Sequence, residues 1–177
     1  MKIQPIHGDI AEMAPRGTEL AALWLRGSGA RFQTWRFGIR DRYPALNLLD
    51  GEAASERPWL AKVDQVFKVN QRDELLRYIY VFSNPTDAHG LPTLEAVKSA
   101  VVHCLDRAVQ LEVRSAALIH IPFAPDSAKP TPSQEVESAK AMIDVLQLWD
   151  ESFPDRIDEV CLVDLEGGFN GLLPPPF

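Results

Sequence analysis

The chain has 177 residues, 46% of them hydrophobic and 24% charged, which is ordinary for a globular protein and argues against disorder over most of its length. Its 18 basic and 25 acidic residues leave a net charge of −7, so we expect no nucleic acid partner. No stretch approaches the roughly 18 consecutive apolar residues of a membrane span, and the first residues lack the apolar centre of a signal peptide. We therefore expect a cytoplasmic protein without membrane contact, folded as one domain over residues 1–177 with a proline-rich tail at 172–177.

The N-terminal part predicts two strands. Residues 2–7 alternate apolar and polar side chains and stop at Gly8-Asp9, which is typical of a half-buried strand, and Pro5 favours an edge position. Residues 18–25 fit either a helix or a buried strand, because an apolar run this short does not settle the period, and we favour the strand.

The middle of the chain is less regular. Residues 26–58 contain scattered glycines, and their aromatic residues fit either loops packed on a core or a binding surface. Two further strands are expected at 65–69 and 78–83, joined by a charged connection, and we expect them to form an antiparallel hairpin.

From residue 78 onward strands alternate with helices. Apolar strands are expected at 78–82, 116–121 and 159–163, with amphipathic helices at 93–111 and 133–149 between them. Continuous apolar strands joined by helical crossovers are buried on both faces of a sheet. The sequence therefore predicts an α/β fold, with a mixed central β-sheet flanked by helices.

The second of these helices has a clear start. Thr131 can cap it, Pro132 takes the first helical position and Gln134 the place of a capping box. Its expected buried stripe is Val136, Ala139, Met142, Ile143 and Leu146.

Read together, Ile6-His7-Gly8-Asp9-Ile10 and the α/β half from Tyr78 onward resemble a macro domain, the module that binds ADP-ribose and related nucleotides. That family opens with a strand ending in Gly-Asp-Ile. It later has an apolar strand running into a proline, as residues 78–85 do here, followed by a helix, a strand, a helix and a final strand. The resemblance covers residues 1–10 and 60–170 and implies a three-layer arrangement.

The resemblance also implies a ligand site in a crevice at the strand ends. It places Asp9 at the adenine amino group and Phe169 against the adenine ring, where stacking contributes about 1–3 kcal/mol in nucleic-acid systems. The small residues Gly27, Ser28 and Gly29 match a loop whose backbone amides meet phosphate. From the residues alone, Asp9 fits a turn cap equally well, and Phe169 fits a ring that closes the end of the core.

The chain departs from the family pattern at both phosphate loops. The asparagines that the family uses for the distal ribose and for hydrolysis are missing from residues 23–30. After residue 121 the family has a glycine-rich turn, whereas residues 122–130 contain three prolines and no glycine, with Asp126 adding negative charge. The resemblance therefore supports the fold more strongly than it supports ADP-ribose binding.

Catalytic motifs are not apparent. His103 and Cys104 are neighbours on a helix and point in different directions, so they do not form a base and nucleophile. His120 within an apolar strand fits a hydrogen-bonded core residue, and His89 a solvated loop. The two cysteines are expected to be packed, reduced thiols, and the four histidines show no spacing typical of metal ligands. We expect no metal and no cofactor.

Two functions follow from these patterns. The first is a non-catalytic macro-like domain that binds a nucleotide or ADP-ribose-like ligand at the strand ends. The second is a protein-interaction domain that retains the fold and has lost the pocket, holding a protein partner through the aromatic segment 32–43 and its acidic surface.

Overall fold

The computed structural model describes residues 1–11, 17–25, 64–69, 72, 74–83, 85–123, 130–164, 168–169 and 171–173. Within them, six strands form one sheet and two long helices accompany it. The strands are β1 (Lys2–His7), β2 (Leu20–Leu25), β3 (Asp64–Lys68), β4 (Tyr78–Ser83), β5 (Ser115–Ile119) and β6 (Glu159–Asp164). The helices are α4 (Leu94–Gln110) and α5 (Pro132–Ser152).

The sheet is mixed. Its strand order is β1-β6-β5-β2-β4-β3, and every neighbouring pair is parallel except β3 and β4, which are antiparallel. The prediction of a strand within the segment 18–25 is confirmed by β2, and the hairpin prediction by the antiparallel pair. β1 lies at an edge, where the missing N–H of Pro5 costs no ladder hydrogen bond on the open side.

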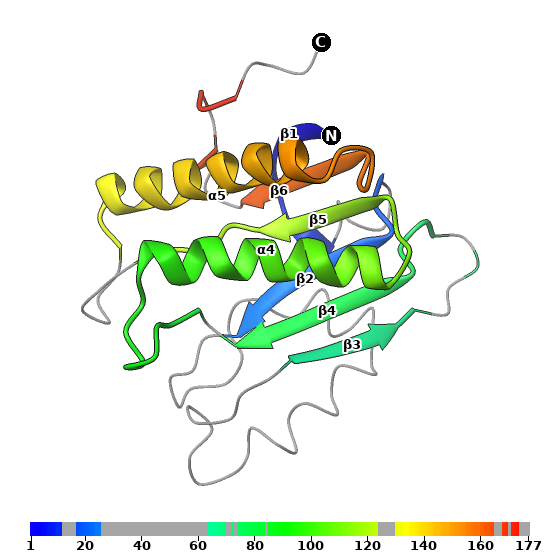
Figure 1. Cartoon of the computed structure of the whole chain (residues 1–177), viewed down its shortest axis with the longest axis horizontal. Coiled ribbons are helices and arrows are strands. Elements are labelled where there is room, and N and C mark those ends of the chain that lie inside the picture. The colour runs from blue at the N-terminus through cyan, green and yellow to red at the C-terminus, as the bar shows by residue number, and fades with distance from the viewer. Residues whose placement is uncertain are drawn as a thin grey trace, which may run out of the picture.

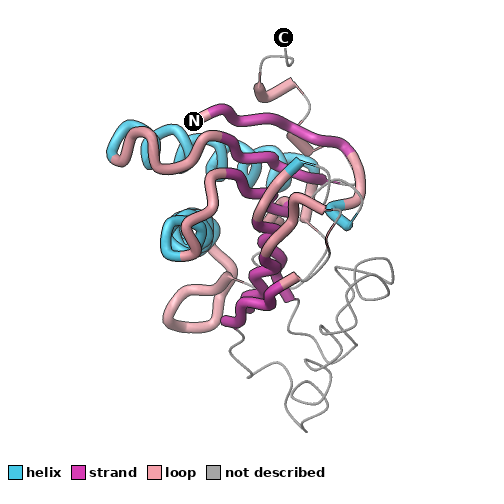
Figure 2. The backbone as a smooth tube through the Cα atoms, turned by 90° about the vertical axis from the view of Figure 1, so that its right-hand side faces the viewer, coloured by secondary structure: helices cyan, strands magenta, loops and turns pink. Residues whose placement is uncertain are grey.

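The helices α4 and α5 lie side by side on one face of the sheet (Figure 1). Figure 2 shows the sheet nearly edge-on, with both helices on the same side of it. On this face the strands contribute alternate residues such as Leu20, Ala22 and Tyr80, which pack against the helices. The intervening residues, Ala21 and Leu23 among them, face the opposite side of the sheet, where Ile10, Ala11 and Leu76 pack on them. This alternation follows from the pleat of each strand.

The two helices begin as the sequence predicts. The Thr93 hydroxyl accepts from Ala96 N at the start of α4. At the start of α5, Thr131 and Gln134 form the reciprocal capping box, with Pro132 at the first helical position. Because a cap satisfies amides that the helix itself leaves unpaired, these residues fix where each helix starts.

The predicted burial of one residue in the α5 stripe is wrong. Val136 is 40% exposed, whereas the other four members of the stripe are buried. The first turns of α5 extend past the ends of β5 and β6 (Figure 1), so neither of these two strands lies beneath them. The helical period alone does not show how far the supporting sheet extends.

At the amino-terminal ends of the strands, ion pairs and hydrogen bonds join the four connections that lead into β2, β4, β5 and β6. The Glu19 carboxylate accepts from Arg114 N at 2.7 Å and from Arg77 Nη1 at 3.1 Å. Arg114 in turn donates to both carboxylate oxygens of Asp158, at 3.1 and 2.6 Å. This network ties the residues preceding β2, β4, β5 and β6 to one another.

We expect acid to weaken the fold through such carboxylates. The hydrogen bond from Arg114 lowers the pKa of Asp158, and backbone hydrogen bonds from Leu91 and His89 lower the pKa of Asp87. A lowered folded-state pKa gives stability that is present above the unfolded-state value, about 3.9, and is lost as pH falls through the folded-state value. Urea titrations should therefore show a free energy of unfolding that declines below about pH 4. Asp158→Asn and Arg114→Gln should each flatten this decline, and an unchanged decline in both would contradict the assignment.

Candidate functional site

The carboxyl ends of five parallel strands, β1, β6, β5, β2 and β4, meet at one edge of the sheet. In open α/β sheets, ligands bind outside this edge. The residues that follow or end these strands are therefore the candidates for a site, among them Asp9, His120, Asp164 and Phe169.

Asp9 follows β1 and is held in a defined position. Gly8 N donates to Asp164 O at 3.0 Å, which joins the ends of β1 and β6. The Asp9 Oδ1 atom then accepts from Ala11 N at 2.8 Å. This bond shows that the turn-capping role considered for Asp9 is real. It engages one carboxylate oxygen and leaves Oδ2 outside that bond, so ligand binding by Asp9 stays a prediction.

Phe169 is buried in this structure. Its side chain is 2% exposed, and its ring meets that of His120 edge-on, with centroids 5.1 Å apart and planes at 80°. The ring thus closes the end of the core beside β5 and β6. A base could stack on it only after the ring became accessible, and the stacking role stays a prediction.

The other predicted ligand residues lie outside the part of the chain that the structure describes. These are Gly27, Ser28 and Gly29, and with them the aromatic segment 32–43 and Asp126.

A row of three polar side chains crosses the ends of β1, β6 and β5. His7 pairs with Asp164 in the register of β1 and β6, and Ile119 pairs with Val163, so His120 follows at the level of Asp164. Partners in parallel strands project to the same face, which here is the face of α4 and α5. His120 N also donates to Val163 O at 2.9 Å. A carboxylate therefore lies between two imidazoles along this edge of the sheet.

Gly168 fits closely into this row. Its backbone N–H donates to Asp164 Oδ2. A Cβ atom at this position would lie 2.7 Å from that same oxygen and 3.6 Å from Cε1 of His120. An alanine at position 168 would therefore require the Asp164 carboxylate to shift.

Gly168→Ala should displace the Asp164 carboxylate and break this hydrogen bond. We expect a loss of about 1–2 kcal/mol in the free energy of unfolding, measured by urea denaturation. Gly17→Ala is the matched control, since a Cβ there meets no atom of the described residues within 4 Å. Equal stability of the two variants would contradict the close fit at Gly168.

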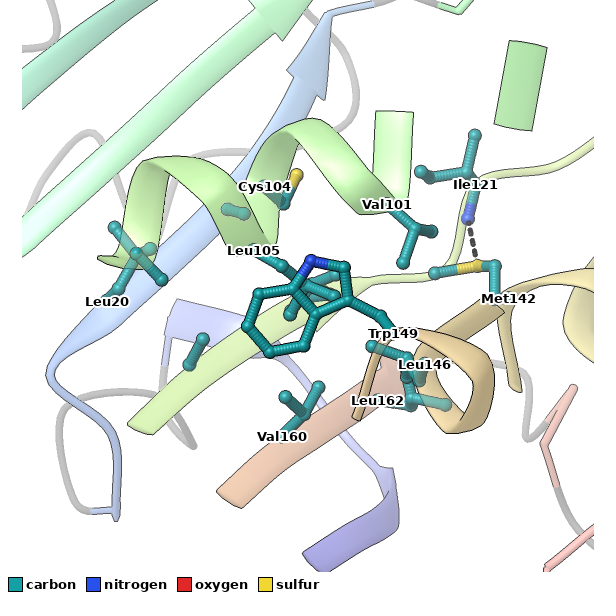
Figure 3. Packing of buried hydrophobic residues seen from close by; sticks show 14 of the residues in the cluster. Leu20, Val101, Cys104, Leu105, Ile121, Met142, Leu146, Trp149, Val160 and Leu162 are labelled. Atoms are coloured by element: carbon teal, nitrogen blue, oxygen red, sulfur yellow. Dashed lines mark hydrogen bonds between the residues drawn. The ribbon is translucent and has the colours of Figure 1, made fainter. Parts of the chain in front are cut away.

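The backbone of His120 and Ile121, the first two residues after β5, is hydrogen-bonded within the protein. His120 O accepts from Trp24 Nε1 at 2.9 Å, and Ile121 O accepts from the hydroxyl of the buried Ser138. Ile121 N donates to the thioether sulfur of Met142 at 3.5 Å, the dashed line in Figure 3. These bonds explain why β5 ends at Ile119, two residues before the end predicted for this strand. The next residue, Pro122, has no N–H to offer.

The start of α5 is similarly occupied. Gln134 N donates to the Thr131 hydroxyl at 3.3 Å, and Glu135 N donates to Thr131 O at 3.0 Å. Pro132 has no N–H, and the carboxylate of Glu135 stands in the first turn. A helix N-terminus attracts anions through unpaired amides and its dipole. In α5 the Thr131 hydroxyl already accepts from one of these amides, and the Glu135 carboxylate already lies at the positive end of the dipole.

Both cysteines are unpaired and buried, as predicted. Burial raises the pKa of Cys161 to about 11 and also raises the pKa of Cys104, so each sulfur is a thiol at neutral pH. Among the residues placed by the structure, no three His, Cys, Asp or Glu side chains are grouped as metal ligands. None of the helices in those residues is long and apolar enough to cross a membrane.

Asp164 and Trp24 were not predicted from the sequence. Asp164 is the first charged residue after the apolar run of β6, and this position at a strand end was the available signal. Trp24 gave no signal in the sequence, because its indole N–H donates to the carbonyl of His120, which is 96 residues away in sequence.

No protein-family model matches the chain, and no curated protein matches its sequence. Solved structures match its fold. The macrodomain of Mycobacterium tuberculosis DarG has a TM-score of 0.61 and 15% identity, covering 90% of this chain and 96% of that one. The GDAP2 macro domain has a TM-score of 0.63 and 14% identity, covering 98% and 83%. The Trypanosoma brucei macrodomain in complex with ADP-ribose has a TM-score of 0.65 and 12% identity, covering 94% and 66%. The chain therefore has the macro-domain fold, as its sequence predicts.

Proposed function

We propose that this protein is a non-catalytic binding domain for a nucleotide or ADP-ribose-like ligand, which lies at the carboxyl ends of the parallel strands. The observation that carries the proposal is the position of Asp9. Its carboxylate is fixed at the end of β1 by the bond to Ala11 N, beside the end of β6. One similar structure, the Trypanosoma brucei macrodomain, is a complex with ADP-ribose, and another from that organism is a complex with ADP.

Asp9 would recognise the base. A carboxylate oxygen accepts hydrogen bonds only, so Oδ2 suits the exocyclic amino group of adenine. Gly27, Ser28 and Gly29 would bring backbone amides to the ligand, and Phe169 would cover the base after a local rearrangement. The bond from Ala11 orients the carboxylate before the ligand arrives, which lowers the ordering cost of binding.

The non-catalytic part of the proposal is supported by the two cysteines and by His103. The thiols are buried and protonated, so neither is a nucleophile. His103 is 58% exposed on α4 and the adjacent Cys104 is buried, so they do not face each other. Release of product from an ADP-ribosylated substrate by the purified protein would overturn this part.

Asp9→Asn should weaken ligand binding at least about tenfold, or about 1.4 kcal/mol. The asparagine oxygen can still accept from Ala11 N, which preserves the turn and places the NH2 group where the second carboxylate oxygen was. A donor then faces the donor amine of the base. The measurement is a calorimetric titration with ADP-ribose, followed by ATP and NAD.

Asp87→Asn is the matched control for this titration. Asp87 lies in the loop after β4, and its Oδ1 accepts from His89 N and Leu91 N at 2.8 and 2.9 Å, a capped turn like that of Asp9. This variant should bind as the unmodified protein does. Equal binding by the Asp9→Asn and Asp87→Asn variants would contradict the role of Asp9. A flat titration of the unmodified protein would favour the protein-interaction function instead, to be followed by a search for protein partners.

A further inference from the structure

We infer that Trp24 is a positioning residue of the ligand site, because its indole joins the carboxyl ends of β2 and β5 beyond the point where their backbone ladder stops. The inference rests on the function proposed above, since it concerns the site at the strand ends. It identifies a buried side chain that sets the affinity through the spacing of the residues that contact the ligand.

The pairing of β2 with its two neighbours ends at different levels. β2 pairs with β4 along its whole length, to Leu25, and β5 pairs with β6 as far as Ile119. Pairing between β2 and β5 stops earlier, at Ala22 and Leu118. Figure 1 shows the arrowhead of β2 beside that of β4 and apart from that of β5. At its carboxyl edge, the ladder of the sheet is therefore interrupted between β2 and β5.

The indole of Trp24 bridges this interruption. Continued in the same register, the pairing of Ala22 with Leu118 would place Trp24 opposite His120. There the indole Nε1 donates to His120 O at 2.9 Å, so a side-chain hydrogen bond joins the two strands beyond their last backbone pair. The Trp24 side chain is 5% exposed, and separating a buried donor from its acceptor carries a desolvation cost. The bond therefore holds the end of β2 to β5.

The acceptor of this bond is itself fixed to the other strand ends. His120 N donates to Val163 O at 2.9 Å, and Gly8 N donates to Asp164 O at 3.0 Å. Hydrogen bonds thus run from the end of β2 through the ends of β5 and β6 to the end of β1, where Asp9 follows directly. The indole bond therefore sets the position of the end of β2 relative to Asp9.

The proposed ligand contacts lie on both sides of the interruption. Asp9 follows β1, in the part of the sheet that contains β1, β6 and β5, whereas Gly27, Ser28 and Gly29 follow β2 in the sequence. A ligand that contacts both groups binds more tightly when their spacing is set before it arrives, because less conformational freedom is lost on binding. Loss of the indole bond should therefore weaken binding through the spacing of these groups.

The test is a calorimetric titration with ADP-ribose of the full chain, unmodified and with Trp24→Phe or Trp149→Phe. Both tryptophans belong to the same buried cluster, but the Trp149 indole has no hydrogen-bond acceptor among the residues that the structure describes. Trp149→Phe is therefore the matched control for the loss of an indole from the core. We expect Trp24→Phe to raise the Kd at least about fivefold, the factor that corresponds to one hydrogen bond, and Trp149→Phe to leave it within about twofold. Each titration is made at a temperature where the variant is folded, so a loss of stability alone does not change the Kd.

A second measurement uses the unmodified protein, so it decides the inference even if Trp24→Phe fails to fold. The indole N–H of Trp24 gives its own resonance in a heteronuclear NMR spectrum, and this resonance reports on the bond to His120 O. Because coupling between two equilibria is reciprocal, a bond that strengthens ligand binding is itself strengthened by the ligand. We expect the Trp24 indole resonance to shift on saturation with ADP-ribose and that of Trp149 to stay in place. An unchanged Trp24 resonance would overturn the inference.

The outcomes of the titration separate this inference from the proposed function. If the unmodified protein binds ADP-ribose and the two variants bind it equally well, Trp24 serves the core alone, and the proposed function stands. If the unmodified protein binds none of ADP-ribose, ATP and NAD, the proposed function fails, and this inference fails with it.

Discussion

Trp149→Ala should cost about 3–5 kcal/mol in the free energy of unfolding, a large part of the stability of a typical domain. The Trp149 indole is 6% exposed and belongs to the buried cluster between the helices and the sheet that also includes Leu105 of α4 (Figure 3). Truncation would leave a cavity where the two helices meet the sheet. Because the surroundings of such a cavity relax only in part, the loss exceeds the transfer free energy of the ring.

Trp149→Phe separates the ring from its N–H group. Trp149 Nε1 is buried, and no hydrogen-bond acceptor for it lies in the described part of the chain. An unsatisfied buried donor is costly, so its removal should offset part of the lost packing, and we expect a net loss of about 1 kcal/mol. Urea denaturation of both variants measures the two costs. Phe153→Ala, at a 52% exposed ring that touches Trp149, should change stability by less than about 1 kcal/mol. Equal losses for Trp149→Phe and Trp149→Ala would contradict this account of the indole.

Met142→Ala should lower the free energy of unfolding by about 2–5 kcal/mol. It should also destabilise the backbone that follows β5. The Met142 side chain is fully buried, and its sulfur accepts from Ile121 N at 3.5 Å. The substitution therefore removes both core volume and the partner of a buried backbone donor. Hydrogen exchange of the Ile121 amide should become faster by the factor that corresponds to this loss in the free energy of unfolding.

Met142→Leu isolates the hydrogen bond from the volume. Leucine nearly fills the same space but has no acceptor, so the expected loss is about 1 kcal/mol, mostly from the unpaired Ile121 N–H. Leu148→Ala on the outer side of α5, where the side chain is 64% exposed, should change stability by less than about 0.5 kcal/mol. Unchanged exchange of the Ile121 amide in Met142→Leu would contradict a structural role for the sulfur contact.

Local chemistry in the sequence determined most of the architecture. The apolar runs of β4, β5 and β6 each belong to a strand buried on both faces. Apolar runs that are separated by long amphipathic segments fit few folds other than a sheet covered by helices. Thr131, Pro132 and Gln134 form the start of α5 that the capping pattern predicts, because a cap is made by residues three positions apart. Pro5 indicated an edge strand, since it cannot donate to a ladder on both sides.

Only the tertiary structure decided features that depend on distant neighbours. The segment of β2 fitted two periods, and its parallel partners β4 and β5 settled it as a strand. Val136 satisfied the helical period but is exposed, because the sheet does not extend beneath it. At the candidate site, the sequence placed Asp9 at the end of a strand by resemblance and local pattern. The adjacency of His7, Asp164 and His120 arises from strand register. The hydrogen bonds that join Trp24, Ser138 and Met142 to the backbone following β5 arise from helix packing and strand order. These contacts join residues far apart in sequence, so no local pattern encodes them.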